Sequence, residues 1–272
     1  MRIAVFCVNY NSYDCLKSYL DSLEEALSAC PECELTVVCT DNSPNKQEIA
    51  LDYSSFEVKM LQSPQNLGYF GGIEHSIRNL KKDLSTFDYF IVSNVDLTVD
   101  KKFFWELSNL DLDKNVGCIA PLIYSQTEQK NRNPESVYRY SKKRLRILKL
   151  LYSWSFLLFL YEKFFYKKQS KASVKCFDSI YAAHGSFFIF TKNALSFVAT
   201  FHYPMLLYGE EIYVAEELTK KNLSTVYYDK LVINDIDHVS TSKMKSHFIL
   251  QCHKESIAYL LRTYYSGKNV SK

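Results

Sequence analysis

Glycine and proline are both scarce in this sequence, with 7 glycines and 6 prolines among 272 residues. This composition excludes collagen-like chains and Pro/Gly-rich disordered chains. Because glycine is so rare, we expect the backbone to require it wherever several glycines gather. Charge of one sign is lacking as well, since the formal net charge is only +3. A charge this small gives no indication of a nucleic-acid partner.

The start of the sequence lacks the pattern of a secretory leader, because MRIAVFCVNY passes directly from Arg2 into a strand-like run without a cleavage site. The uncharged run at 150–161 would extend about 18 Å as a helix, against about 30 Å of bilayer hydrocarbon. We therefore expect a cytoplasmic protein whose 8 cysteines are reduced. Cys30 and Cys33 form a CxxC pair, but a zinc site would need further ligands, and none is evident.

What is present is an alternation of strand-like and helix-like segments. Apolar runs rich in β-branched residues predict strands at 3–10, 35–40, 57–61, 88–97 and 186–191, with an extended segment at 224–235. Apolar residues at helical spacing predict helices that begin near Asp14 and at Lys192, and helices at 71–84, 209–221 and 244–264. Strands that alternate with helices predict an α/β fold with a mostly parallel sheet covered by helices on both faces.

One segment differs from the rest in charge. Residues 142–171 contain nine basic side chains and one acidic side chain, and they surround the uncharged run at 150–161. Such a segment can lie in the interface of a membrane, with its lysines and arginines near anionic lipid. A core helix with solvated basic ends is the alternative. The charge asymmetry favours the membrane surface.

Polar residues stand where several predicted strands end. Asn9, Asp41 and Asp96 occupy such positions, and ligands of parallel sheets bind beyond the carboxyl ends of the strands. We therefore expect these three side chains to converge on one cleft. In the triplet Asn94-Val95-Asp96 the carboxylate is a suitable ligand for a hard divalent cation, although Asp also ends strands without any ligand.

Glycines and acidic residues mark two further places. The run Asn66-Leu67-Gly68-Tyr69-Phe70-Gly71-Gly72 holds three of the 7 glycines at a predicted helix start, where bare backbone can approach a ligand or form a tight turn. Glu210 and Glu211 follow Gly209 at another helix start. Adjacent helical side chains diverge by about 100°, so we expect one carboxylate to act as a general base and the other to point elsewhere. His184-Gly185 and His238 are further candidates, although a lone histidine is more often structural.

The order of these motifs is more informative than any one of them. The series runs Asn9-Tyr10-Asn11, Asp41-Asn42-Ser43, Asn66-x-Gly-x-x-Gly-Gly, Asn94-x-Asp96, Gly185, Gly209-Glu-Glu and His238. It resembles the family 2 glycosyltransferases over residues 1–240, and most closely their rhamnosyltransferase-like branch, which builds bacterial surface polysaccharides. The resemblance implies a GT-A fold and an inverting enzyme that uses a nucleotide-sugar and Mg2+ or Mn2+.

The resemblance also implies an organisation of the chain. It divides the chain into a GT-A domain at 1–240 and a C-terminal helical segment at 241–272. Within the domain, the parts would be a nucleotide-sugar-binding half at 1–125, a basic and apolar helical insertion at 135–180, and an acceptor-binding half at 181–240.

Site residues follow from the same resemblance. Donor-binding residues would be Asn9, Tyr10, Asn11, Asp41, Asn66, Gly68, Gly71, Gly72, Asn94 and Asp96. The metal would be held by Asp96 and His238. Glu211, next to Glu210, would be the catalytic base, and His184 and Gly185 would face the acceptor.

The partners implied are a UDP- or dTDP-linked sugar and a saccharide acceptor carried on a lipid diphosphate. The protein would then be peripheral on the inner face of the bacterial inner membrane, bound through 142–171. Two alternatives stay open, a sugar nucleotidyltransferase and a catalytically silent scaffold at the membrane surface. The first strand ends in Asn-Tyr-Asn rather than in a glycine-rich loop with Arg or Lys, which counts against the nucleotidyltransferase.

Overall fold

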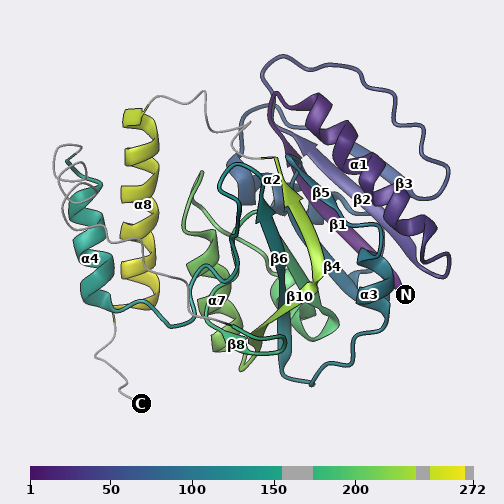
Figure 1. Ribbon diagram of the computed structural model, residues 1–272. Helices are drawn as coiled ribbons and strands as arrows, with labels where there is room; N and C mark the ends of the chain where they lie inside the picture. The colour runs from purple at the N-terminus through teal and green to yellow at the C-terminus, as the bar shows by residue number, and fades with distance from the viewer. Residues whose placement is uncertain (155–173, 237–245, 267–272) are drawn as a thin grey trace.

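A computed structural model describes residues 1–154, 174–236 and 246–266. They form a ten-stranded sheet in the order β3-β2-β1-β4-β9-β6-β10-β5, with β7 paired to β6 and β8 paired to β10. Helices cover the sheet on both faces, while α4 and α8 stand side by side at one edge (Figure 1). The predicted α/β class is confirmed.

The first half of the chain follows the predicted alternation closely. Its elements are β1 (Arg2–Asn9), α1 (Tyr13–Ser28), β2 (Glu34–Asp41), β3 (Glu57–Gln62), α2 (Gly68–Asn79), β4 (Tyr89–Asn94), β5 (Leu97–Val99) and α3 (Phe103–Ser108). The run expected as one strand at 88–97 is interrupted at Val95 and Asp96, which separates β4 from β5.

The second half contains three strands that the sequence pattern did not predict, Val116–Ser125, Lys130–Asn131 and Ser179–Ile180. Its elements are β6 (Val116–Ser125), β7 (Lys130–Asn131), α4 (Lys142–Leu151), β8 (Ser179–Ile180), β9 (Phe187–Thr191), α6 (Leu195–Val198), α7 (Glu210–Lys220), β10 (Ser224–Asp235) and α8 (Ser246–Tyr264). Two short 3₁₀ turns, Leu84–Thr86 and Lys192–Ala194, complete the elements of the described residues.

Strand directions differ between the two halves of the sheet. β3, β2, β1 and β4 are parallel neighbours, as expected. β9, in contrast, lies antiparallel between β4 and β6, and β5 is antiparallel to β10. The sheet is therefore mixed in its second half, because β9 enters from the opposite end after the long segment that follows β7.

Alternating side chains of each strand supply two hydrophobic cores. On β1, Ile3, Val5 and Cys7 pack on the side of α1 and α3, whereas Ala4 and Phe6 pack on the side of α2 and α7. The second core explains much of the aromatic excess. Its buried rings contact one another in edge-to-face, tilted and stacked pairs, and they include Phe70, Phe188, Phe190, Phe197, Phe201, Tyr203 and Tyr213.

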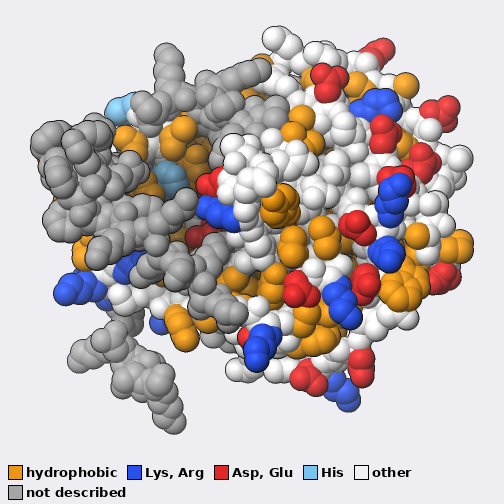
Figure 2. Space-filling model, viewed as in Figure 1, with side chains coloured by type: hydrophobic (Ala, Val, Ile, Leu, Met, Phe, Trp, Pro, Cys, Tyr) orange, Lys and Arg blue, Asp and Glu red, His pale blue; other side chains and the backbone are white. Residues whose placement is uncertain are grey.

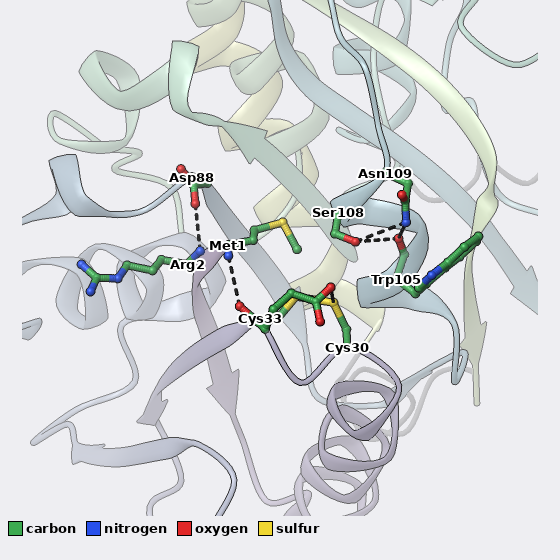
Figure 3. The surroundings of a disulfide bond; sticks show 9 residues. Met1, Arg2, Cys30, Cys33, Asp88, Trp105, Ser108 and Asn109 are labelled. Atoms are coloured by element: carbon green, nitrogen blue, oxygen red, sulfur yellow. Dashed lines mark hydrogen bonds between the residues drawn. A yellow bond between two sulfur atoms is a disulfide. The ribbon is translucent and has the colours of Figure 1, made fainter.

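Cys30 and Cys33 are joined by a disulfide in the turn after α1 (Figure 3). Their Cα atoms are 5.7 Å apart, a separation typical of disulfides. The expectation that all cysteines are free thiols is therefore wrong for this pair. The turn lies beside the chain start, where the Met1 ammonium group donates to the carbonyl oxygen of Glu32.

The surface charge of α4 differs from that of the opposite side of the sheet. Over α1 and α3 acidic and basic side chains are interspersed (Figure 2), with ion pairs such as Lys17–Asp21 and Lys101–Glu25. α4 instead carries five basic residues and no acidic one. Within the described part of the chain, no helix combines the length and the apolar character that crossing a bilayer requires. Most of the uncharged run at 150–161 lies outside the described residues.

Candidate functional site

A cavity of about 320 Å³ lies beyond the carboxyl ends of β1 and β4. Its other walls come from the start of α2, from the loop before α7, from residues 184–186 and from Phe248 at the start of α8. This is the position at which parallel sheets bind ligands. The cavity is thus assembled from segments that lie far apart in the sequence.

Most of the predicted site residues lie around this one cavity. Those that line it are Tyr10, Asn66, Gly68, Asn94, Asp96, His184, Gly185, Glu210 and Glu211. Asp96 and Glu211, which are separated by more than one hundred positions in the sequence, thus share a cavity. Of the three side chains expected to converge on one cleft, Asn9, Asp41 and Asp96, only Asp96 lines it.

Asn9 and Asp41 do not line the cavity but lie buried beside it. The Asp41 carboxylate accepts hydrogen bonds from the Asn9 amide (3.0 Å), the Tyr13 hydroxyl (2.8 Å) and the Ser43 hydroxyl (2.6 Å). A fourth bond comes from the Ser43 backbone N–H. These bonds join the ends of β1 and β2 to α1, so Asp41 fixes the sheet edge on which the cavity is built.

Four other predicted residues lie elsewhere. Asn11 is exposed and has a positive φ of 54°, and Gly71 lines a separate surface cavity with His75 and His202. Gly72 packs against Val8, where a Cβ would be only 2.7 Å from a valine methyl group. His238 lies outside the described residues.

The glycine-rich run brings the start of α2 against the loop that precedes α7. Gly68 has a φ of +74°, and a Cβ on it would lie 2.1 Å from the carbonyl oxygen of Leu206. The next residue, Tyr69, donates its backbone N–H to that same oxygen at 3.1 Å. Only glycine fits this close approach, which closes one side of the cavity.

Two consecutive left-handed residues turn the chain into α7. Tyr208 has a φ of 69° and Gly209 a φ of 85°. The turn directs the N-terminus of α7 at the cavity, so the diverging side chains of Glu210 and Glu211 both reach its wall. Both residues thus lie at the cavity, and the assignment of the base to one of the two carboxylates stays a prediction.

Burial makes both carboxyl groups weak acids. Desolvation raises the pKa of Glu210 to about 7. The pKa of Glu211 is also raised well above its usual range, first by desolvation and then by the negative charges of Glu210 and Glu135. A carboxyl group tuned toward neutrality can take up a proton at physiological pH, which suits a general base.

Gly185 lies directly against the Glu211 carboxylate. A Cβ at Gly185 would be 2.5 Å from Oε1 of Glu211, and a hydrogen bond with the Gly185 backbone lowers the pKa of that carboxyl group against the larger effect of burial. Gly185 is thus placed to position Glu211. The neighbouring His184 is oriented by its backbone N–H, which donates to Asn133 at 2.7 Å, and by its ring Nδ1, 3.0 Å from the Ser186 hydroxyl.

The oxygen atoms of the side chains on the strand side of the cavity suit a divalent cation. Asp96 is 6% exposed and lines the cavity together with Asn94, so both offer oxygen atoms. Mg²⁺ is commonly held by one or two carboxylates together with substrate phosphates. Among the described residues, the one group of three potential ligand side chains that lie close together is Cys30, Glu32 and Cys33, and its two cysteines are joined by the disulfide and so offer no thiolate.

Several residues of the site were missed by the sequence motifs. Arg132 lines the cavity and pairs with Asp235 at 2.9 Å, and neither residue belongs to a recognisable motif. Tyr69 lines the cavity from within the glycine-rich run, whose aromatic residues alone do not indicate which ring faces a ligand.

α8 packs against the loop that precedes α7. The ring of His253 is stacked between Tyr208 (centroids 3.6 Å apart) and Tyr152 at the end of α4 (4.3 Å). The Ser256 hydroxyl donates to the carbonyl oxygen of Leu207 at 2.7 Å. α4 and α8 therefore help to fix the residues that lead into Glu210.

The comparisons with known proteins agree with this architecture. A family model described as glycosyl transferase family 2 matches residues 4–195. None of the curated proteins compared with the chain matches it.

Solved structures share the fold at low sequence identity. S. aureus TarS 1-349, in complex with UDP-GlcNAc, has a TM-score of 0.58 at 11% identity, covering 97% of this chain and 67% of its own. GalNAc-T7 with UDP, GalNAc and Mn2+ has a TM-score of 0.60 at 11% identity, covering 98% of this chain and 48% of its own. The mannosyltransferase PcManGT from Pyrobaculum calidifontis, with GDP-Man and Mn2+, has a TM-score of 0.52 at 11% identity, covering 99% and 76%. These similarities show the GT-A fold.

Proposed function

Because the chain belongs to glycosyl transferase family 2 and is therefore a glycosyltransferase, we propose that it moves a sugar from a nucleotide-sugar to an acceptor hydroxyl with inversion. The observation that supports this chemistry is the single cavity shared by Asp96 and by Glu210 and Glu211. A group that holds the donor diphosphate through an ion and a group that activates the acceptor must face the same space.

Glu211 is our candidate for the base. Its carboxylate would accept the proton of the acceptor hydroxyl as that oxygen attacks the anomeric carbon and the bond to the diphosphate breaks. Gly185 holds this carboxylate from one side, and Glu210 helps to keep its pKa high. A divalent ion, Mg2+ or Mn2+, bound through Asp96 with Asn94 beside it, would supply neutralisation of charge on the departing diphosphate.

The test of the base is Glu211→Gln. We expect transfer to fall by about 10²–10⁴-fold while donor affinity stays near that of the wild type, because the amide cannot accept the proton. Glu48→Gln is a matched control, since Glu48 is exposed and away from the cavity. Ordinary turnover in Glu211→Gln would show that the base is another residue.

The donor can be identified by a thermal-shift screen of UDP-, dTDP- and GDP-sugars with and without Mn2+. A true donor at 100 times its Kd adds about 2.7 kcal/mol of stability. Nuclear magnetic resonance of the product would then test inversion through the configuration at the anomeric carbon. A chain that turns over no nucleotide-sugar would instead favour the silent scaffold.

The acceptor that we propose is a saccharide on a lipid diphosphate in bacterial surface-polysaccharide synthesis, as in the rhamnosyltransferase-like branch. The support comes from α4, with basic residues Lys143, Arg144 and Arg146 and exposed apolar residues Ile147 and Leu150. A helix of this kind suits the inner face of the bacterial inner membrane, where each basic residue contributes about 1 kcal/mol near anionic lipid.

Vesicle binding tests the membrane proposal. The triple variant K143E/R144E/R146E should lose binding to phosphatidylserine-containing vesicles, whereas K17E/K101E/K114E on the other side of the sheet should keep it. Equal binding by the two variants would overturn the assignment to α4.

A further inference from the structure

Tyr69 combines a buried hydroxyl group with a position on the wall of the cavity. Among the described residues, its oxygen has no hydrogen-bonding partner, although it is shielded from solvent. Buried polar groups nearly always have such a partner, since leaving one unpaired costs free energy. An unpaired group that lines a cavity is explained when a ligand supplies the partner.

The backbone holds this hydroxyl in place. Tyr69 follows Gly68, whose left-handed conformation brings the chain against Leu206, and its backbone N–H is bonded to the Leu206 oxygen. Its ring also packs against Phe70, with the ring centroids 5.0 Å apart. The backbone and the ring of Tyr69 therefore have contacts that do not depend on a substrate, which suits a group that recognises a ligand.

The surroundings of the hydroxyl indicate which part of a substrate it meets. Burial raises the pKa of Tyr69 well above its ordinary value, and the charges of Glu210, Asp96 and Glu211 raise it further. The group is thus a neutral hydroxyl near both the carboxylate proposed for the metal and the carboxylates beside the acceptor. In an inverting displacement the transferred sugar lies between the leaving diphosphate and the attacking hydroxyl.

We propose that Tyr69 is a substrate-binding residue whose hydroxyl forms a hydrogen bond with a hydroxyl of the transferred sugar. This inference rests on the proposed function and deepens it, because it assigns a sugar-selecting group within the same cavity. A phenol can donate to a sugar hydroxyl and accept from one, so it suits a neutral, polar partner.

Tyr69→Phe tests the inference, because it removes one oxygen atom and leaves the ring. The probes are a nucleotide-sugar that the wild type turns over and the corresponding nucleoside diphosphate. We expect kcat/KM and affinity for the nucleotide-sugar to fall about tenfold, the effect of one hydrogen bond, while affinity for the diphosphate changes less than about twofold. Tyr89→Phe is the control, since Tyr89 lies at the far end of β4.

Deoxygenated donors sharpen the test. One donor lacking a single sugar hydroxyl should bind the wild type about tenfold more weakly and should show no further loss with Tyr69→Phe. Unchanged kinetics in Tyr69→Phe would overturn the inference, and so would an equal loss for the nucleoside diphosphate. If the wild type turns over no nucleotide-sugar at all, the proposed function fails as well, which distinguishes the two failures.

Discussion

Asp41 and Glu210 are both buried carboxyl groups near the cavity, but their surroundings differ. Asp41, which is 1% exposed, accepts four hydrogen bonds from Asn9, Tyr13 and Ser43. Glu210, which is 5% exposed, has a pKa raised to about 7 by desolvation. One region is arranged to stabilise a carboxylate, whereas the other makes its charge costly. The difference suggests that the strand ends contribute stability and that the start of α7 gives up stability for reactivity.

The largest effect on stability is expected from Glu210→Gln. A folded-state pKa of about 7, above the ordinary 4.5, means that the folded protein holds this proton more tightly than the unfolded chain. That contribution is present below pH 4.5 and is lost as the pH rises through 7. At pH 8 the variant should therefore be more stable by about 3 kcal/mol, at about 1.4 kcal/mol per pKa unit, and at pH 4 it should equal the wild type.

Urea unfolding at the two pH values measures this difference. Glu255→Gln, at an exposed position of α8, is the control and should show no pH-dependent gain. A gain of the same size at pH 4 and pH 8 would mean that ionisation of Glu210 is not its cause.

Gly185→Ala is expected to have a slightly smaller effect, on the rate of turnover rather than on the stability of the fold. Its methyl group would displace the Glu211 carboxylate, and a misplacement of about 1 Å can cost about 10²-fold in turnover, or roughly 2.7 kcal/mol. Steady-state kinetics should show the loss in kcat rather than in donor KM. Adding Glu211→Asp shortens the side chain and should restore part of the turnover. A double variant slower than Gly185→Ala would argue against this clash.

Asp41→Asn tests the opposite side of the comparison. Its amide nitrogen would face donors that now meet a carboxylate oxygen, so the unfolding free energy at pH 7 should fall by about 2 kcal/mol. The change thus has the opposite sign to that of Glu210→Gln, which alters the other region, at the start of α7. Asp111→Asn, at an exposed position, provides the baseline. Stabilisation by Asp41→Asn would break the contrast between the two regions.

The smallest effect concerns the stack behind the loop. His253→Ala should lower the unfolding free energy by about 1 kcal/mol through loss of its ring contacts, whereas His253→Phe should retain most of it. Desolvation lowers the pKa of His253 to about 4, so the wild type should lose stability as the pH falls from 6.5 to 4. The Phe variant should lack that part of the acid sensitivity, which thermal unfolding across this pH range would measure.

The parallel half of the sheet could be predicted because each of its strands is a short apolar run with a polar end. β6 was not predicted because Gly117 and Pro121 interrupt its apolar pattern, and proline is unusual inside a sheet. The direction of β9 was not predictable either, because its own residues do not encode the end of the sheet from which the chain returns.

The site shows the same division. The sequence motifs identified Asp96, Glu210 and Glu211, and the structure places all three around one cavity. This part was predictable because sheet topology largely decides where residues at strand ends meet. The sequence does not reveal that Tyr69 faces the cavity while Phe70, its neighbour, is fully buried in the core. Those orientations depend on the contact between Gly68 and Leu206, two segments that folding alone brings together.

The C-terminal end of β10 connects the wall of the cavity, which includes Asp235, to the rest of the sheet. β10 pairs with both β6 and β5, and the Ile236 backbone N–H donates to the carbonyl oxygen of Asp96 at 3.2 Å. During synthesis on a ribosome, the N-terminal strands emerge long before residue 236. The nascent chain therefore has Asp96 early but gains a complete cavity only after Asp235 and Phe248, which also line it, have been made.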